Sequence, residues 1–218
     1  MENKSDKLKV AIVLGATGLV GEELTNQLIL DDSFGKIVVI SRRPLKLNHP
    51  KIQVLLVDFD NLAEHALDLQ GDVLFSCLGT TIKIAKTKEA QYKVDYTYQY
   101  NVANICAENG VEHYVLISSL GANSKSGVFY NKMKGELEEA VLKLPFKFIS
   151  ILQPSVLDGN RKEFRLGEKI GIIIMKIIGF LPILNNYRVA NVKKVAKCMI
   201  NCVKNKKTGI INNYFITK

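Results

Sequence analysis

The chain has 218 residues, 47% of them hydrophobic and 23% charged, a balance that is typical of a globular protein and excludes a disordered one. This length suffices for one α/β domain with a sizeable core and little more. The net charge of +9 comes from lysines scattered along the chain, so contact with a nucleic acid or an acidic membrane surface is less favoured than a solvated surface.

The cysteines and histidines form no metal-binding pattern. The four cysteines contain no C-x-x-C pair and the three histidines stand far apart, so we expect no metal. Cys198 and Cys202 lie four residues apart on an expected helix and are better explained as small core residues. Reduced cysteines, and a polar segment without a signal-peptide pattern before the first strand, predict a cytoplasmic protein.

Apolar strands alternate with helices along the chain, and the strands are apolar on both faces, as in a parallel sheet covered by helices on both sides. The expected strands are Val10–Leu14, Lys36–Ile40, Ile52–Val57, Val73–Cys77, Tyr114–Ser118, Lys147–Leu152 and Ile210–Phe215. The expected helices are Leu19–Leu30, Asn61–Leu69, Glu89–Glu108, Asn131–Leu144, Lys162–Gly179 and Val192–Lys204. The alternation predicts an α/β fold with a doubly wound, mostly parallel sheet of about seven strands.

No linker or repeat divides the sequence, so we expect a single domain over residues 1–218, with a small substrate-covering part at about 155–190. Within that part the stretch Ile170–Leu184 is very apolar, but Lys176 and Pro182 interrupt it, which argues against a membrane-spanning helix. Core packing, a dimer interface and a substrate lid stay open for it, and contact with a membrane surface is less favoured.

A glycine-rich turn with the spacing G-x-x-G-x-x-G follows the first strand. A helix that starts at once after this strand directs its free N–H groups and the positive end of its dipole at an anion. Gly15 suits the tight turn, Gly18 a close approach to phosphate, and Gly21 close packing of helix on strand. We expect a dinucleotide diphosphate here, and a turn without ligand is the less favoured alternative. The expected contacts are Gly15, Ala16, Thr17, Gly18, Leu19, Val20 and Gly21.

The second strand ends in Ser41-Arg42-Arg43, where an enzyme specific for NAD usually carries Asp or Glu for the ribose 2′-hydroxyl. Two guanidinium groups and a hydroxyl are suited to a 2′-phosphate instead, so NADP(H) is preferred over NAD(H). Asp58, followed by Phe59, comes after the third strand and is placed to contact the adenine. A helix N-cap is an equally good explanation of Asp58.

The fourth strand ends in Cys77-Leu78-Gly79-Thr80. Gly79 permits a close approach to the nicotinamide side of the cofactor, and the threonine hydroxyl can bind phosphate or carboxamide. A plain turn is the alternative. After the sixth strand, Pro154 is expected near the nicotinamide, or else serves only to fix the turn.

The catalytic candidates follow the fifth strand, which ends in Ser118-Ser119. Tyr130 and Lys134 are spaced i, i+4 and so share one face of a helix. Carbonyl reduction needs a proton donor, and a neighbouring ammonium makes a phenol a better acid. A serine hydroxyl at the strand tip can hold the carbonyl oxygen. Taken alone, Y-x-x-x-K is common by chance, but here it follows the glycine turn, the basic strand end and the serine pair in order.

These motifs together resemble the short-chain dehydrogenase/reductase superfamily over nearly the whole chain, and its atypical branch, which includes the human Tat-interacting protein, in particular. The resemblance implies an NADP(H)-binding Rossmann fold with strand order 3-2-1-4-5-6-7. It implies Tyr130 as general acid and base and Lys134 as ligand of the nicotinamide ribose. It also implies that Ser119 orients the substrate carbonyl, with Ser118 as the less favoured substitute. Asp95 stands where many members carry the Asn of a proton relay.

The resulting hypothesis is an NADP(H)-dependent oxidoreductase acting on a small carbonyl or alcohol substrate. Two alternatives stay open: an NADPH-binding regulatory or sensor protein without significant turnover, and an epimerase-like enzyme, which the short chain after Pro154 disfavours.

Tyr92, Tyr96 and Tyr100 recur on one face of the expected fourth helix. Packing or a subunit seam explains them better than cofactor stacking, so a homodimer is a candidate assembly.

Overall fold

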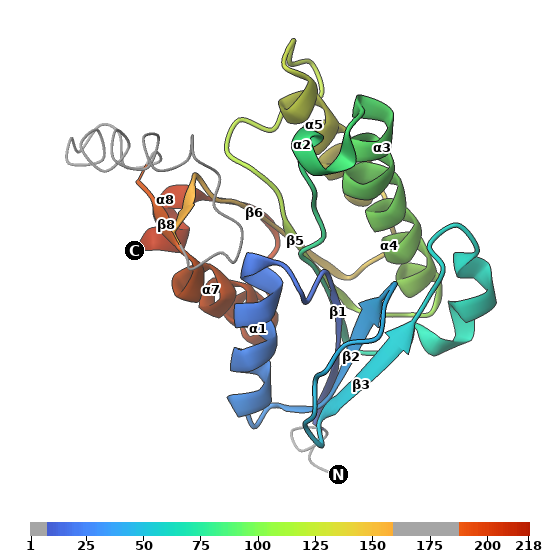
Figure 1. Ribbon diagram of the computed structural model, residues 1–218. Helices are drawn as coiled ribbons and strands as arrows, with labels where there is room; N and C mark the ends of the chain where they lie inside the picture. The colour runs from blue at the N-terminus through green and yellow to red at the C-terminus, as the bar shows by residue number, and fades with distance from the viewer. Residues whose placement is uncertain (1–7, 159–187) are drawn as a thin grey trace.

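The buried runs of Val, Ile and Leu form the central sheet of the protein, which is known here from a computed structural model that describes residues 8–158 and 188–218. Seven parallel strands lie in the order β3-β2-β1-β4-β5-β6-β9. This is the strand order that the sequence resemblance implied. Figure 1 shows β3, β2 and β1 side by side. The strands are β1 Lys9–Leu14, β2 Phe34–Ser41, β3 Ile52–Leu56, β4 Val73–Ser76, β5 His113–Ile117, β6 Phe148–Gln153 and β9 Gly209–Asn212.

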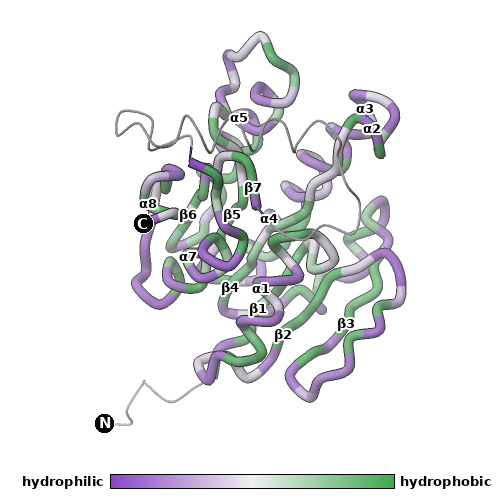
Figure 2. Tube along the Cα trace, turned by 60° about the vertical axis from the view of Figure 1, so that its left-hand side comes forward, coloured by the Kyte–Doolittle hydropathy of each residue, from purple (hydrophilic) through white to green (hydrophobic). Residues whose placement is uncertain are grey.

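Helices cover both faces of the sheet, which confirms the doubly wound α/β fold. On one face α1 (Leu19–Leu30) and α7 (Val192–Lys204) pack side by side on the sheet and share one apolar core with it. On the other face the 3-10 helix η1 (Leu62–Asp68), α4 (Tyr98–Glu108) and α5 (Phe129–Val141) enclose a second core. Figure 2 shows the hydrophobic residues concentrated along the strands between these layers.

The predicted helix Glu89–Glu108 is a composite of three helical segments. It consists of α3 (Lys88–Tyr92), a π-helical turn η2 (Lys93–Thr97) and α4. A short helix that the sequence did not predict, α2 (Ile82–Ala85), precedes it. Single-turn π-helices inside longer helices are often found at functional sites, and η2 carries Asp95, a residue of the site described below.

The predicted last strand, Ile210–Phe215, is wrong in its second half. The strand ends at Asn212, and residues Asn213–Thr217 form a short helix, α8. The reason is the fully buried Asn213, whose amide donates to the carbonyl of Arg188 and accepts from the N–H of Ser155. These bonds turn the chain out of the sheet and bring Ile216 into the core.

The remaining differences are small. The predicted helix Asn61–Leu69 is the 3-10 helix η1, and a two-stranded pair, β7 (Leu157–Asp158) with β8 (Ala190–Asn191), was not predicted. The predicted helix Lys162–Gly179, and with it the apolar stretch Ile170–Leu184, lies outside the described residues. Within the described ranges, no helix is long and apolar enough to cross a membrane.

The register of the sheet brings three strand ends together. Leu14, the last residue of β1, lies opposite Ile40 of β2 on one side and Ser76 of β4 on the other. The segments that follow β1, β2 and β4 therefore begin at the same edge of the sheet, and ligands of open α/β sheets bind at this edge.

Candidate cofactor site and active site

The turn between β1 and α1 is held so tightly that it requires two of its three glycines. Gly15 has φ +87°, and a Cβ there would lie 2.6 Å from the backbone of Cys77 and of Leu78. A Cβ on Gly21 would lie 2.2 Å from the carbonyl oxygen of Gly15. The glycines thus let α1 and the segment after β4 approach the end of β1, as their sequence positions indicated.

Gly18 differs, because the fold itself does not exclude a side chain at this position. A Cβ there would lie 3.4 Å from the nearest atom, the Gly15 oxygen, which is ordinary contact. Gly18 is the N-cap of α1 and supplies no side-chain hydrogen bond to the first turn. Leu19 and Val20 follow it on the wall of a cleft. The positive end of a 12-residue helix therefore faces this cleft without a side-chain cap.

The cleft has a volume of about 600 Å³, a size suited to a small-molecule or cofactor site. Its walls come from the N-terminus of α1, the segment after β4, α3 with η2, and the end of β5 with the start of α5. The lining residues that the sequence had singled out are Gly18, Leu19, Val20, Cys77, Leu78, Gly79, Thr80, Asp95, Ser118, Tyr130 and Lys134.

Tyr130, Lys134 and Asp95 meet on one side of the cleft. Tyr130 lies in the first turn of α5 with its ring at the surface, and the Lys134 ammonium lies 5.9 Å from the centre of that ring. The same ammonium forms an ion pair of 3.1 Å with the Asp95 carboxylate, and the two side chains are only 4% and 1% exposed. The other Asp95 oxygen accepts the backbone N–H of Thr80 at 2.7 Å.

The charge on Lys134 is stabilised despite burial. Burial by itself lowers the pKa of a lysine, but Tyr130, Asp95 and Glu138 act in the opposite direction, and the net pKa of Lys134 lies above its ordinary value of 10.5. Lys134 is therefore a permanent cation at the base of the cleft, next to the Tyr130 phenol.

A second buried carboxylate, Glu138, was missed by the sequence interpretation. It lies on α5 four residues after Lys134 and is 5% exposed. The Ser118 hydroxyl donates to it, and the Gln153 amide donates to both of its oxygens at 3.0 Å. The signal was present in the sequence, because Tyr130, Lys134 and Glu138 are spaced i, i+4, i+8 and share one helix face.

The two serines after β5 are placed differently. Ser118 is buried and lines the cleft, with its hydroxyl proton directed at Glu138. Ser119 is half-buried, does not line the cleft, and directs its hydroxyl at the carbonyl of Leu120 at 3.3 Å. The neighbouring Pro154 is buried, and its carbonyl accepts the N–H of Leu120, which joins the loop after β5 to the segment after β6.

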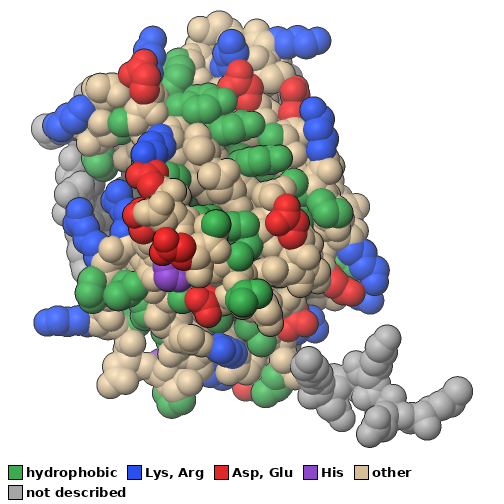
Figure 3. All heavy atoms as spheres, turned by 90° about the vertical axis from the view of Figure 1, so that its right-hand side faces the viewer, with side chains coloured by type: hydrophobic (Ala, Val, Ile, Leu, Met, Phe, Trp, Pro, Cys, Tyr) green, Lys and Arg blue, Asp and Glu red, His purple; other side chains and the backbone are tan. Residues whose placement is uncertain are grey.

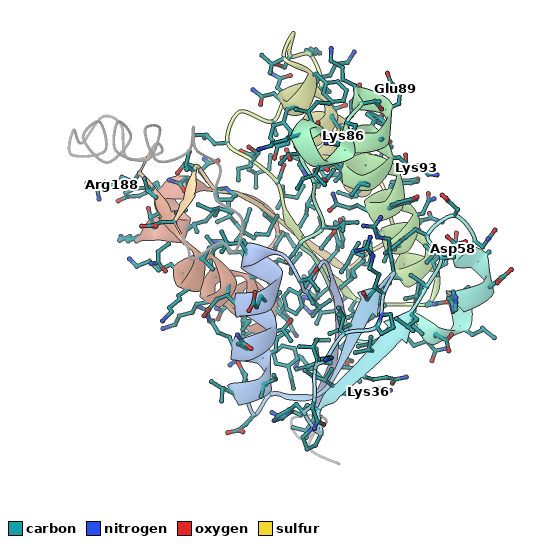
Figure 4. The ribbon with its side chains drawn as sticks, viewed as in Figure 1. Lys36, Asp58, Lys86, Glu89, Lys93 and Arg188 are labelled. Atoms are coloured by element: carbon teal, nitrogen blue, oxygen red, sulfur yellow. The ribbon has the colours of Figure 1, made fainter. Side chains whose placement is uncertain are left out.

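The residues predicted for the adenosine end lie outside the cleft. Arg42 and Arg43 are exposed, and the Ser41 hydroxyl both donates to the carbonyl of Arg43 and accepts its N–H, which shapes the turn after β2. The exposed Asp58 (Figure 4) accepts hydrogen bonds from the Asp60 N–H and the Asn61 side chain, which shape the turn before η1. The N-cap of η1 is Asn61, so the alternative that Asp58 caps this helix is wrong.

Three other predicted cofactor contacts also lie away from the lining of the cleft. Phe59 is buried and stacks on Tyr98, with ring centres 5.0 Å apart. The Ala16 side chain is buried in the core under α1, whereas Thr17 is exposed at the turn. Among the residues that the structure describes, no group of three or more His, Cys, Asp or Glu side chains could hold a metal ion.

Fold and site together define an NAD(P)-binding protein with a Rossmann-like sheet. The chain belongs to the NAD(P)H-binding family, whose profile matches residues 15–157. Relatives include protein HTATIP2 of Rattus norvegicus, 36% identical over 186 residues that cover 84% of this chain and 73% of the relative. Another is the mitochondrial protein FMP52 of Candida glabrata, 38% identical over 159 residues that cover 73% and 68% of the two chains.

Solved structures share the fold at low sequence identity. The enzyme WbmH of Bordetella bronchiseptica, in complex with NAD+, superposes with a TM-score of 0.73 at 14% identity, covering 94% of this chain and 75% of its own. The human epimerase family protein SDR39U1, with NADPH, gives a TM-score of 0.64 at 15% identity, covering 93% and 73%. The relatives and the fold confirm the resemblance to the atypical short-chain dehydrogenase/reductase superfamily.

Proposed function

We propose that this protein is an NADP(H)-dependent oxidoreductase of the short-chain dehydrogenase type that acts on a small carbonyl or alcohol substrate. The observation that carries the proposal is the buried Lys134–Asp95 ion pair directly beside Tyr130, in a cleft that also receives the uncapped N-terminus of α1. A surface phenol beside a charged lysine is an arrangement suited to a proton donor for an oxyanion that develops in the cleft.

The chain's own groups fit a dinucleotide. The free N–H groups at the start of α1 suit a diphosphate, and the segment from Cys77 to Thr80 forms the adjoining wall, where the cofactor's central part would lie. When bound, NADPH supplies the hydride. Tyr130 then donates its phenolic proton to the substrate oxygen, and Lys134 stabilises the phenolate that remains and binds the nicotinamide ribose. In alcohol oxidation the same groups act in reverse.

The serine assigned to the substrate oxygen is Ser119, with Ser118 as its substitute. Ser118 already lines the cleft, whereas Ser119 reaches it only if its hydroxyl leaves the Leu120 carbonyl. The Ser119 hydroxyl is bound at 3.3 Å, near the long limit for a hydrogen bond, so it is available to a better acceptor such as a carbonyl oxygen.

The preference for NADP(H) over NAD(H) belongs to the same proposal. Arg42 and Arg43 are exposed directly after β2, and no carboxylate occupies the strand end where an NAD-specific enzyme would carry one. Both guanidinium groups can move to a 2′-phosphate without breaking a salt bridge found in the described ranges. Pro154 and Asp58 are the weakest of the proposed cofactor contacts, because their own local bonds already explain them.

The decisive experiment replaces Tyr130 with Phe. NADPH binding is measured by titration calorimetry, and NADPH consumption is followed over a panel of small carbonyl compounds. We expect Tyr130→Phe to keep wild-type affinity for NADPH and to lose at least 100-fold in turnover, because only the proton donor is removed. Failure of the wild-type protein to bind either reduced dinucleotide would overturn the proposal.

Two alternatives remain as proposals with their own observations. An NADPH-binding sensor without turnover is favoured by the position of Ser119 outside the cleft, and wild-type binding without any NADPH consumption would establish it. An epimerase-like activity is suggested by neighbours such as MoeE5, solved with UDP-glucose and NAD, with a TM-score of 0.68.

We also propose a cytoplasmic location for the protein. Cell fractionation tests it, since the fungal relatives are described as mitochondrial.

A further inference from the structure

The Glu138 carboxylate is a buried charge that the proposed chemistry does not use. It lies on α5, two helical turns beyond Tyr130 and one turn beyond Lys134, and it is nearly inaccessible to solvent. Among the described residues it forms no salt bridge within 4 Å, and its hydrogen bonds come from neutral donors, Ser118 and Gln153. A buried carboxylate is costly to keep unless it has a specific task or a good set of partners.

Its partners connect the three elements that carry the candidate active site. Ser118 follows β5 and precedes Ser119, whereas Gln153 is the last residue of β6 and precedes Pro154. Glu138 itself belongs to α5, the helix of Tyr130 and Lys134. One carboxylate therefore joins two strand tips to the catalytic helix through three hydrogen bonds, all on the cofactor edge of the sheet.

The charge of Glu138 also acts on the site. The charged groups near it on α5 are Lys134 and Glu139, and Asp95 of η2 lies behind Lys134, while the contacts from β5 and β6 are neutral. Lys134 thus stands between two carboxylates, and Asp95 alone suffices to balance it. Ionised Glu138 gives the cluster of Lys134, Asp95 and Glu138 a net negative charge, which opposes a phenolate on Tyr130.

We propose that Glu138 is a positioning residue for this site, which holds Ser118 and Gln153 against α5 and whose charge sets how readily Tyr130 releases its proton. The inference depends on the proposed function only in taking Tyr130 as the proton donor. Removal of the Glu138 charge makes the Tyr130 phenol a stronger acid, because Lys134 stays charged beside Asp95. Over the roughly 12 Å of two helical turns, a unit charge in partly buried surroundings shifts a pKa by about one unit.

The test measures the ionisation of Tyr130 directly and needs neither substrate nor cofactor. Protein with 13Cζ-labelled tyrosine is titrated by NMR, and Tyr130→Phe assigns the signal. Glu138→Gln keeps the shape and removes the charge, so we expect the pKa of Tyr130 to fall by about one unit. Glu138→Asp keeps the charge and leaves this pKa near the wild-type value. Glu139→Gln removes the exposed neighbouring charge, which solvent screens, and serves as the matched control.

Turnover gives the second readout. In carbonyl reduction, kcat falls at alkaline pH as Tyr130 loses its proton. In Glu138→Gln we expect the apparent pKa of this fall to be lowered by the same amount as the Tyr130 pKa measured by NMR. Glu138→Asp, which cannot reach Ser118 and Gln153 together, loses ten- to a hundredfold in kcat with an unshifted pH profile. An unchanged or higher Tyr130 pKa in a folded Glu138→Gln protein would refute the role of Glu138. Absence of turnover in the wild type, with the NMR shift present, would contradict the proposed function alone.

Discussion

Asp95 and Lys134 form a buried ion pair of 3.1 Å that connects the π-helical turn η2 to the face of α5 that also carries Tyr130. The Asp95 carboxylate also accepts the Thr80 N–H, so one side chain fixes both the lysine and the wall of the cleft after β4. Asp95 thereby gives the buried Lys134 ammonium a counter-charge.

Replacement of Asp95 by Asn tests this pair. The variant removes the carboxylate that pairs directly with the buried Lys134 ammonium. Loss of one partner of a buried ion pair typically costs about 3–5 kcal/mol of the free energy of unfolding. Urea unfolding monitored by circular dichroism measures the loss. Asp60→Asn, which removes the carboxylate of the exposed Asp60–Lys93 pair, is the control and should leave stability nearly unchanged. If the two substitutions lower the free energy of unfolding equally, the buried pair contributes no more to stability than the exposed pair.

The charge of Lys134, which Tyr130 and Asp95 both stabilise, predicts a dependence of stability on alkaline pH. The pKa of Lys134 is raised above 10.5 in the folded protein, so the folded state holds this proton more tightly than the unfolded chain. The resulting stabilisation is fully present below pH 10.5 and is lost as the pH rises through the folded pKa. The free energy of unfolding of the wild type should therefore fall across this range more steeply than that of Asp95→Asn. If the free energy of unfolding falls more steeply with pH in Asp95→Asn than in the wild type, Asp95 does not stabilise the charged form of Lys134.

The sequence predicted what depends on periodicity and local chemistry. The strands β1 to β6, the helices α1 and α7 and the spacing of Tyr130 and Lys134 follow from apolar runs and helix faces, and the structure reproduces them. The last strand failed because its apolar pattern continues through Tyr214 and Phe215, while the buried hydrogen bonds of Asn213 turn the chain into a helix. Long-range bonds of a single side chain leave no periodic signal.

In the candidate site too, features set by local sequence were predictable, whereas features set by long-range contacts were not. Gly15 was expected in a tight turn and Gly21 at a close contact between helix and strand, because their spacing encodes a strand, a tight turn and a helix. The φ of +87° at Gly15 and the 2.2 Å approach at Gly21 confirm both. The pairing of Asp95 with Lys134 and of Glu138 with Gln153 joins residues 39 and 15 positions apart. Such pairs depend on how η2 and β6 lie against α5, which a single sequence does not reveal. The π-helical register of η2, which no propensity predicts, belongs to the same class of tertiary effects.

The two arginines after β2 give a test of cofactor choice. Replacement of Arg42 and Arg43 together by Ala should weaken NADPH binding by 10- to 100-fold and leave NADH binding within about twofold, because only NADPH carries the 2′-phosphate that a guanidinium group binds. Titration calorimetry with both reduced dinucleotides measures the difference. A double replacement of the equally exposed Lys83 and Lys86, outside the cleft lining, controls for the loss of positive charge. Equal weakening of both cofactors would exclude the 2′-phosphate assignment.

A row of tyrosines is the surface on which we propose that a homodimer forms. Tyr92, Tyr96 and Tyr100 stack in sequence along α3, η2 and α4, with ring centres 4.8 and 6.1 Å apart, and all three are half-buried. Hydrophobic side chains gather over this helical face with charged groups at the border (Figure 3). If this face is the seam of a homodimer, Tyr96→Glu yields monomer in analytical ultracentrifugation, while the exposed Tyr214→Glu keeps the wild-type mass. If the wild-type protein is a monomer at all concentrations, the three tyrosines serve packing within the chain and not a dimer interface.

The glycine turn offers a separation of folding from binding. Gly21→Ala places a Cβ 2.2 Å from the backbone oxygen of Gly15 and must displace α1, so we expect a loss of several kcal/mol or failure to fold. Gly18→Ala meets only ordinary contact at φ −82°, so its cost stays at about 1 kcal/mol or less. Its methyl group stands at the open N-terminus of α1, where it should weaken NADPH binding at least tenfold without unfolding the protein.

The control for Gly18→Ala is Gly127→Ala, where an added Cβ meets no atom within 4 Å and which should bind NADPH as the wild type does. Urea unfolding and NADPH titration on the three variants together decide the role of each glycine. A Gly18→Ala protein with wild-type affinity would show that the dinucleotide does not approach the helix terminus. The diphosphate would then have to lie elsewhere in the cleft, even though Gly15 and Gly21 remain essential to the fold.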